Sequence, residues 1–445
     1  MIMRKPSLLI ALIAICLSLN SQEKPVKEEA KKTESVLSLK NVVLGSLNTH
    51  PQIQKLYKAR AVAYQDVEAA KGAFLPTVDF RTAYGPDYTQ NQTVENDGDH
   101  YRTLWRNENS LIINQTLYDG GARESVLQRN SALFDRSLNS IKDGKEALAL
   151  RAVESYINIL RSRKQIELSI QNIKAHVDIL EIVKKRFDNK LVPEADVVQV
   201  QGRLALAQAQ LKREVASLKA SEAGFIEVSG QEPGKLAEPE SVDKNLPEDL
   251  REAQNEAVVS HPSVLANKDT IRAVESSIGE AVSRFSPRIS LELTGAENEN
   301  LSGNRSNDDA YSAMIVLNWN LFRGGSDFAE LSREVHRREQ ETANMFETKR
   351  NLARDVAQAW YTKVGKQEEL SFFKKHEVAS GKTYDAYKSQ YELGKPRTLF
   401  DLLNARSEFF RAKFNVIDAE YSIKSTEYRI LATMGRLVDY FQSLK

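Results

Sequence analysis

The residues best suited to chemistry in this chain are its six histidines, since there is only one cysteine, Cys16. Two histidines recur in matching triplets, at residues 49–51 (THP) and 260–262 (SHP). An imidazole can bind a metal or transfer a proton, so His50 and His261 are candidate ligands. A hydroxyl residue close to a proline is, however, typical of a helix start. We therefore interpret both triplets as caps.

No other arrangement of side chains indicates catalysis. The histidines are scattered, and no cluster of His, Asp and Glu has the spacing of a metal site. Cys16 lies in the N-terminal apolar segment, so the chain without that segment has neither a disulfide framework nor a cysteine metal site. We expect no catalytic residues, no metal and no cofactor, and we do not expect an enzyme.

The two triplets belong to a repeat that runs through the chain. Residues 74–76 (FLP) return at 285–287 (FSP), at the same offset of 211 residues as the histidines. Residues 117–121 (LYDGG) return at 321–325 (LFRGG), at an offset of 204. A tandem repeat of this length indicates equivalent structural units rather than an enzyme with one site. We expect repeats at 37–230 and 248–435, each with a helix, a strand pair, a long helix and a return helix, and a linker at 231–247.

The N-terminus has the form of a secretory signal peptide, at residues 1–21. Arg4 and Lys5 precede an apolar run at 8–19, which is too short to span a bilayer and ends in small polar residues. Lipidation of Cys16 is an open alternative, although Ile15 before it is bulky for such a site. A flexible, Lys/Glu-rich leader is expected at 22–36 and a C-terminal tail at 436–445.

Charge and hydropathy narrow the class of protein further. The net charge is +1, and −1 without Arg4 and Lys5, so no basic excess indicates binding to nucleic acid. No run of about 20 apolar residues follows the signal peptide, which argues against a transmembrane helix. If the chain enters a membrane, it must do so as strands.

Two segments in each half alternate with a period of two. Val78, Phe80, Thr82 and Tyr84 alternate with polar or small residues, and Tyr311, Ala313, Ile315 and Leu317 lie on one face of a returning strand. One face is apolar with aromatics and the other carries charges and amides. This pattern fits outer-membrane strands. It also fits a half-buried sheet on a soluble core, and the strands alone leave both interpretations open.

Each strand pair is followed by an unusually long helical segment, at about 122–189 and 326–393, without a proline. The apolar residues have heptad-like spacing, which winds helices into left-handed coiled coils. Each long helix reverses at a short break, at 190–193 and 394–397, into a helix that runs back. We expect two coiled-coil hairpins per chain.

Oligomerisation follows from the strand count. Four strands cannot close a barrel, and open edges are not tolerated in lipid. Two chains would give eight strands, whose interior side chains mostly fill. Three chains would give twelve, the smallest closed number here with room for a pore, together with a matching cylinder of helices.

The chain resembles the TolC family of outer-membrane efflux proteins. The resemblance rests on the duplication, on the turns at 117–121 and 321–325, and on the hairpin segments at 191–197 (LVPEADV) and 393–405 (LGKPRTLFDLLNA). It implies a mixed α/β membrane protein: a homotrimer with a twelve-stranded β-barrel, four strands per chain, in outer membrane lipid. A long α-helical coiled-coil barrel continues this barrel through the periplasm.

The resemblance also implies a function. The protein would be the export duct of a tripartite efflux pump or a type I secretion system, passively conducting small molecules or unfolded proteins. Its partners would be a periplasmic adaptor and an inner-membrane pump of RND, ABC or MFS type. A coiled-coil gate would control the periplasmic entrance.

The same resemblance implies roles at the hairpin tips. Asp401 would form an acidic ring at the gate, with Asn404 as a second, weaker selectivity position. Tyr391, Arg397 and Asp196 would form a gate latch through directional but breakable bonds. Residues that would dock the adaptor are Lys190, Leu191, Val192, Pro193, Gly394, Lys395 and Pro396. The sequence departs from the family pattern at Lys190, where the family often has glycine, and at Pro396, which looks like an inserted residue.

Three other classes of protein compete with this interpretation. An exported structural coiled-coil protein of the periplasm or envelope would account for the helices but not for the repeated strand pairs. A soluble adaptor would not duplicate the whole series of elements, and a periplasmic enzyme lacks candidate residues. A barrel protein needs detergent for extraction, whereas these three do not.

Overall fold

The computed structural model describes residues 36–444. The expected signal peptide at 1–21 and nearly all of the expected leader at 22–36 lie outside the described residues. The same element order occurs twice in the described part. The first half comprises α1 (Leu39–Thr49), α2 (Pro51–Gly72), β1 (Thr77–Thr89), α3 (Gln92–Asn96), β2 (Arg102–Tyr118), α4 (Ala122–Asp188) and α5 (Glu194–Ser229).

The second half has the corresponding helices and strands. They are α6 (Leu250–Ser260), α7 (Pro262–Ser283), β3 (Arg288–Glu299), β4 (Asn307–Asn318), α8 (Ser326–Glu392) and α9 (Leu399–Thr433). The expected tail contains a further helix, α10 (Leu437–Ser443), in which Leu437, Val438 and Phe441 are buried. Short 3-10 helices occur at Asp243–Asn245 and Leu301–Gly303.

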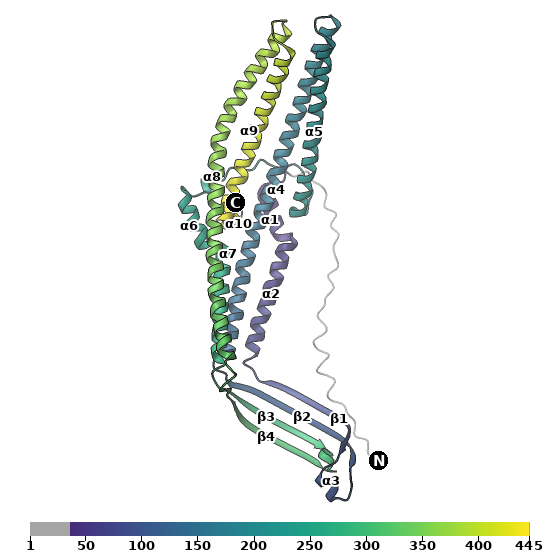
Figure 1. Ribbon diagram of the computed structural model, residues 1–445, viewed down its shortest axis with the longest axis vertical. Helices are drawn as coiled ribbons and strands as arrows, with labels where there is room; N and C mark the ends of the chain where they lie inside the picture. Colours follow the sequence, from purple (N-terminus) through teal and green to yellow (C-terminus); the bar gives the residue numbers. More distant parts are fainter. Residues whose placement is uncertain (1–35, 445) are drawn as a thin grey trace.

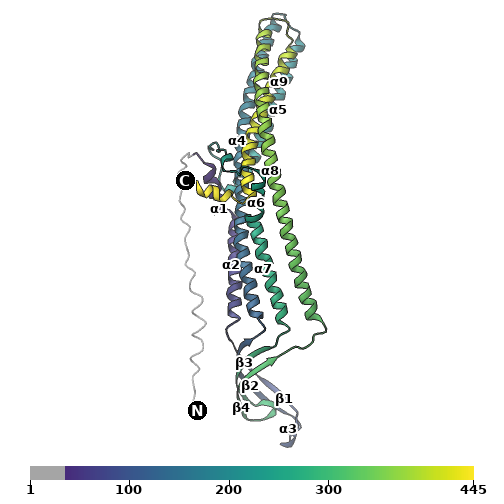
Figure 2. The same cartoon turned by 90° about the vertical axis from the view of Figure 1, so that its left-hand side faces the viewer.

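The molecule is elongated, with the sheet at one end and the two hairpin tips at the other (Figures 1 and 2). The helices α4 and α8 each contain 67 residues, which corresponds to roughly 100 Å at 1.5 Å per residue. Each pairs with the return helix that follows it, α4 with α5 and α8 with α9 (Figure 1). The α1, α6 and α10 helices lie beside the long helices at mid-height (Figures 1 and 2).

The two triplets do begin helices, but the cap differs from the prediction. Nδ1 of His50 accepts a hydrogen bond from the backbone N–H of Gln52 at 3.1 Å, and Nδ1 of His261 accepts one from Ser263 at 3.2 Å. The hydroxyls of Thr49 and Ser260 instead bond backbone carbonyls within the preceding helix. The imidazole itself satisfies one of the free N–H groups at each helix start.

All four strands form one antiparallel sheet in the order β1-β2-β3-β4. The pairing of β2 with β3 joins the two repeats. A register shift between Thr116 and Tyr118 bends β2 close to its helical end. This order leaves β1 and β4 at the two edges of the sheet.

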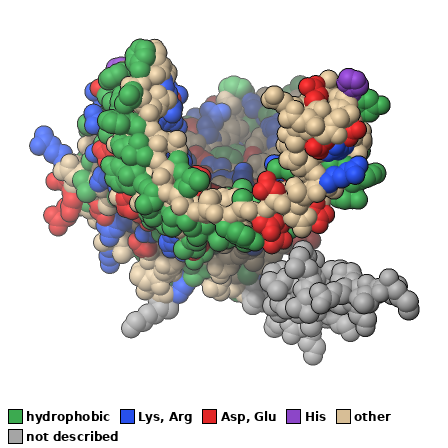
Figure 3. All heavy atoms as spheres, turned by 90° about the horizontal axis from the view of Figure 1, so that it is seen from below, with side chains coloured by type: hydrophobic (Ala, Val, Ile, Leu, Met, Phe, Trp, Pro, Cys, Tyr) green, Lys and Arg blue, Asp and Glu red, His purple; other side chains and the backbone are tan. Residues whose placement is uncertain are grey.

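Large apolar side chains remain exposed on the sheet. They include Phe80, Tyr84, Tyr311 and Ile315, which are 65%, 72%, 73% and 73% exposed. Viewed from the sheet end, hydrophobic side chains gather along a curved wall that partly surrounds a hollow (Figure 3). An apolar surface of this extent on one chain indicates an interface with other molecules or with lipid.

The principal core lies at mid-height, where α1 and α10 pack against α4. Tyr156 of α4 is fully buried, and its hydroxyl donates to the carbonyls of Leu37 at 2.8 Å and Ala237 at 2.7 Å. Leu37 in turn pairs with Leu236 of the inter-repeat segment. One buried phenol therefore fixes the start of the described chain and the connection between the repeats to the same long helix.

Candidate functional site

The hairpin tips differ in how they reverse the chain. At the first tip, the backbone N–H groups of Lys190 and Leu191 donate to the carbonyls of Phe187 and Arg186 at 2.7 and 2.8 Å. Lys190 has a φ of 58°, a left-handed conformation that glycine adopts at lower cost. At the second tip Gly394 occupies this position, with a φ of 70°. A lysine at position 190, where the family often has glycine, therefore leaves the turn unchanged but adds a strained backbone conformation.

The residues expected to dock an adaptor lie at the exposed end of the molecule. The exposed residues among them are Lys190, Leu191, Pro193, Gly394, Lys395 and Pro396, whereas Val192 is half-buried against a small core between the hairpins. Leu191 and Leu393 are 66% and 69% exposed. Each tip thus presents one large apolar side chain beside a lysine.

Asp401 takes part in a local structure that sequence reasoning did not foresee. Its carboxylate accepts hydrogen bonds from the backbone N–H of Thr398 at 3.2 Å and from the Thr398 hydroxyl at 2.9 Å, while its own N–H donates to that hydroxyl at 3.2 Å. This capping box begins α9. Asp401 is half-buried and Asn404, three residues later, is exposed. A ring of Asp401 carboxylates would therefore be built on side chains already fixed by a cap.

Within one chain, the expected latch residues do not bond one another. Nε of Arg397 donates to Oε1 of Gln390 at 2.9 Å, and its guanidinium carbon lies 4.2 Å from the centroid of the Tyr387 ring. Both partners belong to the same hairpin as Arg397. Among residues 36–444, Arg397 and Asp196 form no ion pair, and the buried hydroxyl of Tyr391 has no hydrogen-bond partner. Burial raises the pKa of this phenol.

Close to the tips, a hydrogen bond between the two hairpins of one chain is made by Arg186, which sequence reasoning missed. Its Nη1 donates to the carbonyl of Tyr391 at 2.6 Å, and its guanidinium carbon lies 4.7 Å from the Tyr391 ring centroid. Apolar residues of all four helices pack beside it, including Val183, Val200, Tyr384 and Leu402. Arg186 corresponds in the repeat to Gln390, the residue before Tyr391, but this correspondence does not predict a contact between the two hairpins.

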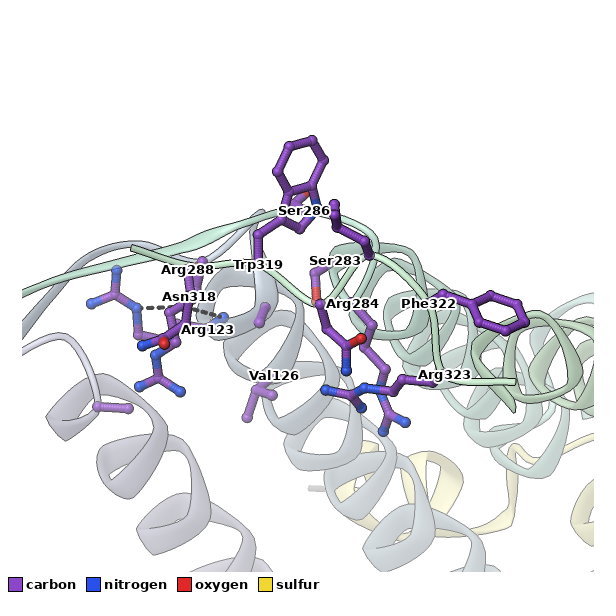
Figure 4. Close-up of a pocket in the computed structure, with 15 residues that line it drawn as sticks. Arg123, Val126, Ser283, Arg284, Ser286, Arg288, Asn318, Trp319, Phe322 and Arg323 are labelled. Atoms are coloured by element: carbon purple, nitrogen blue, oxygen red, sulfur yellow. Dashed lines mark hydrogen bonds and ion pairs between the residues drawn. The ribbon is translucent and has the colours of Figure 1, made fainter. Parts of the chain in front are cut away.

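A second concentration of polar residues lies at the junction between sheet and helices, around a cavity of about 970 Å³ (Figure 4). Three of its arginines are paired: Arg123 with Asp119 at 2.7 Å, Arg284 with Glu330 at 3.0 Å and Arg323 with Asp327 at 3.7 Å. Arg288 donates to the hydroxyl of Thr116 at 3.0 Å. These bonds join neighbouring segments at the junction, and the three ion pairs balance most of the positive charge.

The Asp119 carboxylate also organises this junction. It accepts from the backbone N–H groups of Gly121 and Arg123, both at 3.2 Å, and so caps α4. Its pKa is lowered by the bonds from Arg123 and Gly121, which outweigh its partial burial. The second half has Arg323 at this position, and α8 begins without a side-chain cap.

The described residues offer no catalytic or metal-binding arrangement. In this part of the chain, no group of three or more His, Cys, Asp or Glu side chains could hold a metal ion. Among residues 36–444, none of the helices is both long and apolar enough to cross a membrane.

The chain is similar in sequence to known outer membrane efflux and secretion proteins. The profile of the family described as "Outer membrane efflux protein" matches residues 45–231 and 253–436. The outer membrane efflux protein BepC of Brucella suis is 23% identical over 80% of this chain and 78% of its own length. The alkaline protease secretion protein AprF of Pseudomonas aeruginosa is 22% identical over 88% of this chain and 83% of its own. TolC of Vibrio cholerae is 22% identical over 87% of this chain and 88% of its own.

Solved structures share the fold. The CmeC outer membrane channel of Campylobacter jejuni matches with a TM-score of 0.79 at 14% identity, covering 94% of each chain. CusC matches with a TM-score of 0.78 at 14% identity, covering 94% of this chain and 99% of that chain. With the match of the family profile to both halves, these findings place the protein in the outer membrane, with a periplasmic part: the chain belongs to the outer membrane efflux protein family, the TolC family that its repeats resemble.

Proposed function

We propose that three copies of this chain form the export duct of a tripartite efflux pump or a type I secretion system. The observation that carries this proposal is the sheet, which has four strands, two free edges and large exposed apolar side chains. Lipid does not tolerate unpaired strand edges, so β4 of one copy would pair with β1 of the next. Three sheets would close a twelve-stranded barrel, and the long helices would continue it as a cylinder.

Transport through this duct would be passive, and its energy would come from an inner-membrane pump of RND, ABC or MFS type, coupled through a periplasmic adaptor. Both cargo classes remain in the proposal, small molecules and unfolded proteins, because one relative is named for efflux and another for protease secretion. We also retain the repeat boundaries at 37–230 and 248–435 as the units of this architecture.

The first test is assembly and conductance. Native mass spectrometry of the detergent-solubilised protein should give a mass of three chains, and a planar lipid bilayer containing it should show discrete channel openings. A monomer or dimer with no conductance would contradict the duct. This test needs neither the adaptor nor the pump.

The gate is proposed to lie at the hairpin tips, with three Asp401 carboxylates forming a cation-attracting ring and Asn404 contributing a weaker polar position. Asp401→Asn should abolish block of the channel by a trivalent cation added from the periplasmic side. Thr398→Ala is the matched control, because it removes the same capping box without removing the charge. Equal loss of block in both variants would show that the cap, not the charge, is responsible.

The latch is proposed to form between copies, where Tyr391 and Arg397 of one chain would meet Asp196 of its neighbour. Within the described residues Arg397 and Asp196 form no ion pair with each other, and the exposed side chain of Arg397 can reach a neighbouring copy, which supports this arrangement. In bilayers, Asp196→Asn combined with Arg397→Gln should raise the open probability of the channel. An unchanged open probability would contradict the latch.

Docking of the adaptor can be tested by crosslinking in living cells, since the chain without its signal peptide has no cysteine. Lys190→Cys or Lys395→Cys should capture a periplasmic adaptor, identified by mass spectrometry. Val62→Cys on α2, which is 62% exposed and far from the tips, is the control. Capture from the control but not from the tips would contradict tip docking.

A further inference from the structure

A groove with a strongly positive lining lies between the two hairpins, where α5 and α9 flank α4. Its volume is about 360 Å³. Arg203 and Arg213 line it from α5, Arg411 from α9 and His176 from α4. No carboxylate lines it. The groove is separate from the tips and from the junction beside the sheet.

The arginines of this groove lack acidic partners. In the described part of the chain, Arg203 and Arg411 form no ion pair, and the recorded bond of Arg213 goes to the neutral side chain of Gln210. Glu214 lies nearby, but it accepts a hydrogen bond from Gln210 and does not line the groove. Three guanidinium groups therefore line the groove without an acidic partner, an arrangement that favours an anion.

Two buried groups beneath the groove strengthen this argument. Arg406 is 7% exposed and donates only to neutral acceptors, the side-chain oxygen of Asn172 at 3.1 Å and the carbonyl of Gln171 at 3.4 Å. The charge of Asp178 offsets part of the cost of burying this guanidinium, although among the described residues the two side chains form no ion pair. His176 is 4% exposed, and its Nδ1 has no hydrogen-bond partner. Burial, together with the charges of Arg406 and Arg203, lowers the pKa of His176 to about 4, so the imidazole is neutral and the positive charge of the groove comes from the arginines.

Part of the groove wall is apolar. Phe410 and Phe414 of α9 have ring centroids 6.1 Å apart, and Leu206 faces them from α5. An inorganic ion would leave this wall unused. A volume of this size lies near the lower end of small-molecule sites, which hold roughly 300–1,000 Å³.

We propose that this groove binds a small amphipathic organic anion. Its sulfonate or carboxylate group would lie among Arg203, Arg213 and Arg411, and its aromatic or alkyl body would contact Phe410 and Phe414. A ligand there touches α4, α5 and α9 at once, so it would also tie the two hairpins together. The inference does not depend on the proposed adaptor, pump or cargo.

The experiment uses site-specific protection in the full chain. Ser407→Cys introduces a single thiol in the groove wall of the otherwise cysteine-free mature protein. Alkylation of this thiol by a neutral maleimide is followed in detergent with naphthalene-2-sulfonate, with the neutral analogue naphthalene-2-methanol, or with sulfate alone. We expect saturable protection by the sulfonate and little by the other two.

Substitutions then identify the residues that hold the anion. Arg203→Gln or the more exposed Arg411→Gln should weaken binding of the sulfonate about tenfold, the value of one charged hydrogen bond. Lys212→Gln, which removes the same charge from α5 outside the groove, should change it less than about twofold. Isothermal titration of the protein without the cysteine gives the same affinities independently, and circular dichroism confirms folding.

Several outcomes would overturn the proposal. Equal protection by the neutral analogue would show a purely apolar site, and equal protection by sulfate would show an inorganic anion site. If Lys212→Gln weakened binding as much as Arg203→Gln, binding would depend on the overall positive charge of the protein and not on this groove. Protection that appears only when a purified partner protein is added would show that the groove is a docking surface instead.

Discussion

At the scale of single residues, one arginine and one carbonyl make the hydrogen bond between the hairpins that lies close to the tips. Arg186 reaches the backbone of Tyr391 rather than its hydroxyl, so its bond is independent of the phenol. Its stacking on the Tyr391 ring adds a cation–π contribution. The phenol hydroxyl is itself buried and has no hydrogen-bond partner among the described residues.

Replacing Arg186 should loosen the tips. Arg186→Ala removes a charged hydrogen bond and a stacked guanidinium, which together stabilise the contact by about 2 kcal/mol. Hydrogen exchange of the amides at 387–399 should become correspondingly faster. Lys185→Ala, an exposed neighbour, is the control; the same acceleration in that variant would argue against a specific role for Arg186.

A second residue gives the protein a pH dependence. Glu146 of α4 is 5% exposed, and its carboxylate accepts from the backbone N–H groups of Leu437 and Val438 at 3.0 and 3.1 Å. Burial raises its pKa from 4.5 to about 7, against the lowering effect of these bonds and with a contribution from Asp439 and Asp143. The folded state therefore binds a proton more tightly than the unfolded state does.

The sign of the effect follows from this difference. Between pH 4.5 and about pH 7 the folded state keeps the proton that the unfolded state has lost, so stability falls as pH rises through this range, by roughly 3 kcal/mol in total. Unfolding free energies measured from pH 5 to 8 should show this fall. Glu146→Gln should flatten it, whereas Glu154→Gln, at a surface ion pair with Arg429, should not. A slope unchanged by Glu146→Gln would contradict the assignment.

Sequence reasoning located the tip residues but not their bonds. The segments at 191–197 and 393–405 were chosen from motif resemblance, and they do lie at the two reversals. The capping role of Asp401 could have been predicted, because Thr398 stands three residues before an acid at a helix start. The Arg186 contact could not, because it depends on how two hairpins lie against each other, which no local pattern encodes.

At the scale of elements, each strand pair turns into its long helix through a pair of glycines with positive φ. The two junctions have the same pair of glycines, but other atoms lie much closer to the first glycine in one junction than in the other. A Cβ added to Gly120 would lie 2.5 Å from Cβ of Ser286 and 2.9 Å from the carbonyl of Ser283, whereas nothing lies within 4 Å of one added to Gly324. Both glycines have left-handed backbones, with φ values of 68° and 60°.

This asymmetry predicts unequal effects of the same substitution. Gly324→Ala should cost about 1 kcal/mol for the backbone conformation alone. Gly120→Ala must in addition displace α7 from the sheet junction, and should cost about 3 kcal/mol or more. Thermal unfolding of the two variants in detergent would measure the difference. Equal midpoints would mean that the junction relaxes freely.

The sequence predicted the helices and strands well because each signal was long. Two uninterrupted heptad patterns and four alternating segments identified the elements that the structure contains. Short elements with weak signals were missed, among them α10, whose burial depends on Glu146, a residue almost three hundred positions away. The caps were also misassigned, because an imidazole rarely caps a helix and the neighbouring hydroxyl groups do so more often.

At the scale of the whole molecule, the proposed barrel assigns opposite surroundings to the two faces of each strand. Ile315 of β4 is 73% exposed and would face lipid, and Met314 beside it, 58% exposed, would face the lumen. The single chain exposes both. Only assembly of the proposed barrel would place one side chain in lipid and the other in the lumen.

Lysine substitutions test this assignment. Ile315→Lys should hinder insertion by about 2 kcal/mol, the usual scale for a lysine placed in lipid, and should lower the yield of assembled protein in the outer membrane. Met314→Lys should leave assembly intact and change only the conductance. The opposite ranking of yields would show that the faces are reversed.

The matched length of α4 and α8, 67 residues each, sets the distance between the sheet and the hairpin tips. Because both hairpins extend equally far from the sheet, their tips lie level and mark one fixed depth below the membrane. Removing seven residues from each of the four hairpin helices would keep the apolar seams in register. It would shorten the distance from the sheet to the tips by about 10 Å. Cells carrying such a protein could restore export only by bringing their two membranes, or the parts that bridge them, closer by the same amount.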